Sequence, residues 1–107
     1  MIDPIRCAEF IQRTADQLAE AKGHLFVLEE SLRSVKAIEM KKHPELSVAG
    51  QEREALASDA YRTAVEGVGA ATEKVERLRI QVIAAQAKIE IWRSMEASGR
   101  AMDRATR

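Results

Sequence analysis

Apolar residues recur at alternating steps of three and four positions along two long stretches of this chain. In residues 59–95 the apolar members of this repeat are Tyr61, Ala64, Val68, Ala71, Val75, Leu78, Val82, Ala85, Ile89 and Trp92. In residues 4–42 the same spacing gives Ile11, Thr14, Leu18, Ala21, Leu25, Leu28, Leu32 and Val35. A repeat of seven residues places such members along one face of an α-helix. The pattern therefore predicts two long helices, each with one seam.

The ends of the first predicted helix are marked by residues that favour helix boundaries. Asp3 precedes Pro4, and this pair is typical of a helix start. The aspartate accepts hydrogen bonds from free amides, and proline fits the first helical position. Pro44 stops the helix, because the residue before a proline avoids the α region. These signals predict a helix over residues 4–42.

Residues 43–58 are predicted to connect the two long helices. Ser47 is expected to cap a short helix over residues 48–56, and Ser58 belongs to a second capping signal that opens the helix at Asp59. A connector of this length lets the long helices fold back on each other, seam to seam. We therefore expect an antiparallel hairpin.

The seam fades after Met95, so residues 97–107 are predicted to form a flexible basic tail. Residues 1–96 then form one domain, because a chain of 107 residues holds no more than one. The predicted fold class is all-α: a long antiparallel, coiled-coil-like hairpin with a short connector helix, which assembles into a helical bundle.

The second long helix has a further apolar face opposite its seam. Its members are Ile80, Ile83, Ala84, Ala87, Ile91 and Met95. A hairpin covers only one face of this helix, and a row of isoleucines left in water favours aggregation. Self-association, with a dimer favoured, is the simplest way to cover the face. The alternative is that the connector or the N-terminal turn folds over it.

The charges of the chain balance but are unevenly placed. Lys plus Arg is 17 and Asp plus Glu is 17, which argues against a globally basic nucleic-acid binder. The C-terminal arginines would share one face if the helix continued, and such a row can contact phosphates. These candidates are Arg93, Arg100, Arg104 and Arg107. Because no aromatic residues are interleaved, nucleic-acid binding is expected to be weak or absent, and a solvated tail is the alternative.

No residue set typical of catalysis or metal binding stands out. His24 and His43 lack further ligands at metal-binding spacing. Cys7 is the single cysteine, which excludes an intrachain disulfide and suits a reducing cytoplasm. Its thiol is expected to be buried against the end of the hairpin. Because neither a signal peptide nor a membrane span is apparent, we expect a cytoplasmic, non-enzymatic protein without metal or cofactor.

Three segments of the chain form a recognisable set. They are Gln51-Glu-Arg-Glu-Ala-Leu-Ala-Ser58 with Tyr61 just beyond, Ala84-Ala-Gln-Ala-Lys-Ile-Glu-Ile-Trp-Arg-Ser94, and Glu96-Ala-Ser-Gly-Arg100. From about Leu32 onward, the chain resembles a group of small phage and prophage proteins of similar length. The resemblance implies no assigned activity. It implies a bacterial host cell and a gene neighbourhood of phage recombination and replication, near single-strand annealing and single-strand binding proteins.

The connector is the non-repetitive part of the predicted fold, and loops on a rigid scaffold often bind partners. Gln51, Arg53 and Glu54 are therefore candidates for partner binding; alternatively, Arg53 and Glu54 tie the connector to the helices. We expect an oligomeric interaction or accessory protein in phage DNA recombination or replication, with a protein partner from that module. Two rivals remain: a direct DNA-binding protein that uses the arginine-rich C-terminus, and a modulator of a host enzyme.

Overall fold

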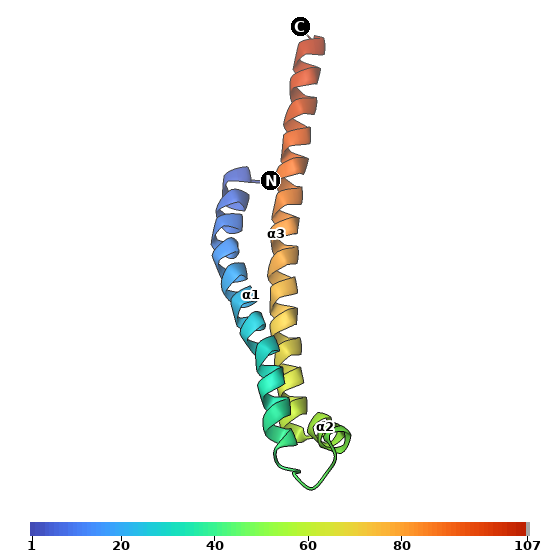
Figure 1. Cartoon of the computed structure of the whole chain (residues 1–107). Helices are drawn as coiled ribbons and strands as arrows, with labels where there is room; N and C mark the ends of the chain where they lie inside the picture. Colours follow the sequence, from blue (N-terminus) through green and yellow to red (C-terminus); the bar gives the residue numbers. More distant parts are fainter. Residues whose placement is uncertain (107) are drawn as a thin grey trace. The chain divides into compact units, whose positions relative to one another are not determined.

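The computed structural model describes residues 1–106, which form three α-helices (Figure 1). The helices are α1 (Pro4–Met40), α2 (Val48–Leu56) and α3 (Asp59–Thr106). The chain divides into two compact units. The terminal unit combines Met1–Ala19 with the chain from Glu76 onward, and the connector unit is Glu20–Val75. Within each unit a segment of α1 packs antiparallel to a segment of α3, which confirms the predicted all-α hairpin with its connector helix.

The seams predicted from the sequence are the faces that become buried. In α3 every seam residue from Tyr61 to Trp92 is buried or half-buried, and all other described residues of this helix are exposed except Gly67. In α1 every seam residue from Ile11 to Val35 is likewise buried or half-buried. Two helices cannot enclose a large side chain between them. Among residues 1–106 the buried apolar residues are accordingly alanines and one valine, and no large side chain is fully buried.

The first helix begins at its predicted cap. Asp3 Oδ1 accepts hydrogen bonds from the backbone amides of Ile5 and Arg6, at 3.0 and 3.2 Å. The helix ends at Met40, slightly before the predicted residue 42. The Lys41 amide still donates to a carbonyl four residues back, but the Lys42 and His43 amides donate to carbonyls three residues back, and this tighter geometry is typical of a helix end.

The short helix α2 lies where the sequence predicts it. Ser47 caps it, because its Oγ accepts a hydrogen bond from the Gly50 amide at 3.2 Å. Ala55 is completely buried and anchors α2 within the connector unit. Lys36 Nζ on α1 donates to Glu52 Oε1 on α2 at 2.6 Å, so the connector is fastened to the first long helix as well.

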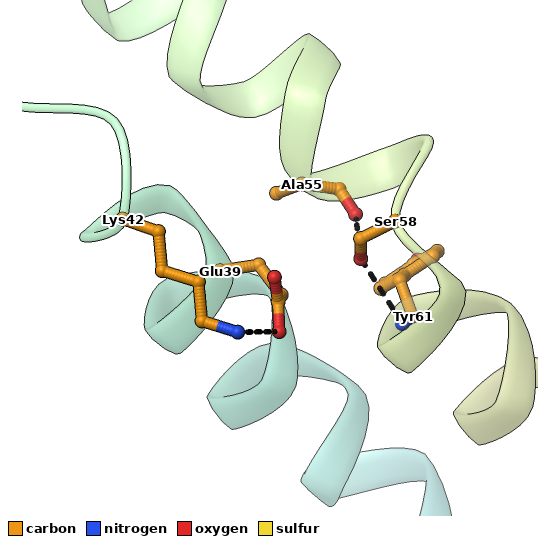
Figure 2. Close-up of polar contacts among 5 residues, drawn as sticks. All are labelled: Glu39, Lys42, Ala55, Ser58 and Tyr61. Carbon is orange, nitrogen blue, oxygen red and sulfur yellow. Dashed lines mark hydrogen bonds and ion pairs between the residues drawn. The ribbon is translucent and has the colours of Figure 1, made fainter. Parts of the chain in front are cut away.

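Ser58 joins α2 to α3 because its hydroxyl acts as both a hydrogen-bond donor and a hydrogen-bond acceptor (Figure 2). Its Oγ donates to the Ala55 carbonyl at 2.7 Å and accepts from the Tyr61 amide at 3.2 Å. Figure 2 also shows Glu39, a buried acid one heptad after Leu32 on the α1 seam. Its carboxylate accepts from Lys42 Nζ at 2.8 Å, so the seam of α1 ends in a satisfied ion pair.

The C-terminal end of α3 differs from the prediction. The helix continues to Thr106, so the expectation that it ends near Met95 is wrong, and residues 97–106 are helical. Alanine, arginine, methionine and glutamate favour helix here, no proline interrupts, and Gly99 costs only about 1 kcal/mol. All residues from 93 to 106 are exposed, and in the terminal unit α3 extends past the start of α1 (Figure 1).

Candidate interaction surfaces

The predicted self-association face of α3 is uncovered in the terminal unit; we call it the outer face. The exposed fractions are 58% for Ile80, 48% for Ile83, 52% for Ile91 and 63% for Met95, and Ala84 and Ala87 are also exposed. No part of the described chain covers these side chains. The alternative prediction, that the connector or the N-terminal turn folds over them, is therefore not what residues 1–106 show.

The outer face extends further along α3 than the sequence indicated. Helical steps of three and four lead from Ile91 through Met95 and Ser98 to Met102, which is 69% exposed. Ile80 and Met102 each lie 11 residues from Ile91, so the face is roughly centred on that isoleucine. This extension was not predicted, because the predicted helix ended at residue 95.

One flank of the outer face is neutralised by ion pairs within α3. Arg79 donates to Glu76 Oε2 at 2.6 and 3.1 Å, and Arg93 Nη1 lies 3.2 Å from Glu90 Oε1. The hydrogen bond to Glu76 and its negative charge raise the pKa of Arg79. Helical spacing places both pairs on the same side of α3. This flank therefore offers little uncompensated charge to a partner.

The other flank of the outer face borders an open groove between α1 and α3 of the terminal unit. Its volume is about 420 Å³, and it is lined by Arg6, Cys7, Phe10, Arg13, Gln81, Ala84, Ala85 and Lys88. Cys7 is half-buried in this groove, which is less enclosed than the predicted burial against the hairpin end. We call this feature the basic groove, because its lining includes three cations and no acid.

The cations of the basic groove differ in their partners. Arg6 Nε lies 3.6 Å from Asp3 Oδ2. Arg13 and Lys88 form no ion pair with any residue in the described part of the chain. The groove was not predicted, because its two walls are far apart along the chain. The signal available in the sequence was a pair of small residues: Cys7, which lies one heptad before Thr14 and so continues the α1 seam, and Ala85 on the α3 seam.

The predicted phosphate-contact residues lie toward the C-terminal end of α3, and the first of them, Arg93, belongs to the neutralised flank of the outer face. Arg100 and Arg104 are exposed, and Arg93 is paired with Glu90. Arg107 lies outside the described residues. The helix does bring Arg93, Arg100 and Arg104 to one side, as the spacing predicted, but helical spacing also places Glu96 and Asp103 nearby.

The connector candidates have mixed surroundings. Gln51 Nε2 donates to the Leu46 carbonyl at 3.2 Å, which gives this side chain a structural role. Arg53 and Glu54 are exposed on α2. The hydrogen bond between the connector and Lys36 of α1 is made by Glu52, which neighbours the predicted Arg53 and Glu54.

Within residues 1–106, no group of three or more histidine, cysteine, aspartate or glutamate side chains is placed to hold a metal ion. His24 is exposed, and His43 Nδ1 lies 3.6 Å from Glu45 Oε1. The same part of the chain has no helix with an apolar stretch long enough to cross a membrane. No family model, curated protein or solved structure matches the chain. Its class is therefore defined by its fold, an all-α antiparallel hairpin with exposed apolar and basic surfaces.

Proposed function

We propose that this chain is a non-enzymatic interaction protein that works as a homo-oligomer, with a dimer favoured, assembled through the outer face of α3. The observation that supports this most is the row of uncovered isoleucines on a helix whose opposite face already packs on α1. Apolar patches of this kind mark association sites on soluble proteins. A second copy offers the same patch, and a two-fold axis makes the patch its own complement.

The thin core of the hairpin also favours assembly. The buried apolar residues are Ala21, Ala55, Ala71, Val75 and Ala85, which are all small. The large seam residues remain half-buried, so each unit gains only part of the hydrophobic stabilisation its sequence offers. Packing against a second hairpin increases that burial without any further chain.

The spacing along the outer face favours an antiparallel dimer centred on Ile91. In such a dimer Ile91 meets its own copy at the axis, and Ile80 lies opposite Met102 of the partner subunit. This pairing follows from the equal intervals of 11 residues on either side of Ile91. The neutralised flank beside Arg79 and Arg93 can then approach the partner without charge repulsion.

Cross-linking of single-cysteine variants tests this arrangement. In a Cys7→Ser background, Ile91→Cys places one thiol at the expected axis, and mild oxidation should link two chains rapidly. Val27→Cys in the same background is the matched control, because Val27 is similarly exposed but lies on α1 of the connector unit. Equal cross-linking rates for the two variants would show collision rather than a specific dimer.

The resemblance to small phage and prophage proteins supports a setting in phage DNA recombination or replication. We propose that the assembled hairpin acts there as an accessory protein that binds a protein of that module. Affinity purification of the full chain from an infected host should recover one such phage protein in stoichiometric amount. Recovery of a host enzyme instead would contradict this setting and favour modulation of the host.

A further inference from the structure

We propose that the basic groove of the terminal unit binds an acidic amphipathic helix of a partner protein. This site borders the outer face and shares Ala84 with it, and the proposal does not rest on self-association. The groove runs between two helices that pack side by side, and a third helix fits along such a groove. The occupant is defined by two properties of the lining, its apolar floor and its basic rim.

The floor of the groove needs an apolar occupant. Cys7 and Ala85 are small seam residues, so the two helices leave space between them where larger residues would fill it. Ala84 and Phe10 complete the apolar part of the lining. A volume of about 420 Å³ is in the range of sites that bind ligands, about 300–1,000 Å³. An aliphatic or aromatic side chain of a partner helix that enters here loses contact with water.

The rim of the groove needs a negatively charged occupant. Arg13 and Lys88 come from opposite walls and have no acidic partner in the described chain, and Arg6 is engaged only at 3.6 Å by Asp3. The cations on the opposite flank of the outer face are already paired within α3. Carboxylates on both sides of an apolar stripe would therefore complement this groove, and such complementarity selects partners and speeds their association.

A protein helix fits these observations better than a single-stranded nucleic acid does. Nucleic-acid grooves combine many backbone contacts with aromatic side chains on which bases stack. Here Phe10 is the only aromatic residue of the lining, and the floor is built from two alanines and a thiol. Nucleic acid is therefore the alternative outcome of the test.

Cys7 provides a direct measurement of occupancy, because it lines the groove and is the single cysteine of the chain. The rate of its alkylation by iodoacetamide is measured in the unaltered 107-residue chain with three probes. The first is a helical peptide with a leucine stripe flanked by glutamates. The second has the same leucine stripe flanked by lysines. The third is an oligothymidylate. We expect the glutamate peptide alone to slow alkylation, by about tenfold at saturation.

Charge reversal on the rim provides the second measurement. The variant Arg13→Glu/Lys88→Glu should weaken protection by the glutamate peptide about tenfold at low salt, since two rim pairs become repulsive. The same variant should gain protection from the lysine peptide. Arg100→Glu/Arg104→Glu is the matched control: it changes the net charge equally at exposed positions outside the groove, and protection should remain unchanged.

Three results would overturn the proposal. Equal protection by the two peptides, or none by either, would show that the rim does not select an acidic helix. Protection by the oligothymidylate alone would assign the groove to nucleic acid. An equal loss of protection in the control variant would show a general effect of net charge. The comparison of the two peptides on the unaltered protein decides the question even if the rim variant folds poorly.

Discussion

Two glutamates on the outer face should separate the proposed dimer into helical monomers. The variant is Ile80→Glu/Ile91→Glu, in which both positions are about half exposed in the single chain. A fully buried isoleucine contributes about 1.5–3 kcal/mol, so the half that remains to be covered is worth roughly 1 kcal/mol per side chain. The dimer contains four of these side chains. Their removal alone costs roughly 4 kcal/mol, or about a thousandfold in the dissociation constant.

The introduced carboxylates add to this loss. Each would enter an apolar interface without a partner, and an uncompensated buried charge is strongly destabilising. The separated hairpin itself should be unaffected, because glutamate is a good helix former at an exposed position. We therefore expect a monomer in sedimentation equilibrium and an unchanged helical signal in circular dichroism.

A matched control is available on α1. Val27→Glu/Ile38→Glu has the same interval of 11 residues and similar exposure, 59% and 58%, but lies in the connector unit. This variant should remain dimeric. Assembly through the outer face is refuted if Ile80→Glu/Ile91→Glu still sediments as a dimer, or if the control dissociates to the same extent.

The remaining predictions concern the hairpin and its C-terminal end. Val75→Ala should lower the free energy of unfolding in urea by about 1–3 kcal/mol, because Val75 is buried. Val65→Ala, at an exposed position, should lower this free energy clearly less. Ser58→Ala should cost about 0.5–2 kcal/mol in the same assay, since it removes the hydroxyl that joins α2 to α3; an unchanged midpoint would contradict that role. Gly99→Ala should stabilise the helix locally by about 1 kcal/mol and so slow hydrogen exchange in the last turns of α3 by up to roughly fivefold. Faster exchange there would count against a helix. The isolated protein should not bind single-stranded DNA tightly at physiological salt; a submicromolar affinity lost on deletion of residues 97–107 would contradict this.

The hairpin could be predicted because the sequence pattern that specifies it is local and repeated. A seam residue such as Val75 belongs to a period that continues over five heptads, so no single position decides the outcome. The caps were predictable for a related reason, since Asp3, Ser47 and Ser58 satisfy amides only a few residues away. Both kinds of prediction needed no knowledge of distant parts of the chain.

The end of α3 could not be predicted from the seam, because a seam reports packing against a partner helix and not helix formation. After Trp92 the seam positions are no longer apolar, and α3 extends past the start of α1, yet the backbone remains helical to Thr106 (Figure 1). Helix propensity was the better guide here, and it also extends the outer face to Met102. The basic groove was hidden for a different reason: it requires Cys7 and Ala85 to meet from opposite ends of the chain.

The association state of the unaltered chain shows directly whether the outer face assembles. Sedimentation equilibrium over a range from low to tens of micromolar gives the molecular mass without any variant or label. The proposed assembly through the outer face predicts twice the mass of the 11.9 kDa chain at the upper end of this range. A mass of one chain throughout would contradict it, and the isoleucines of α3 would then remain in water.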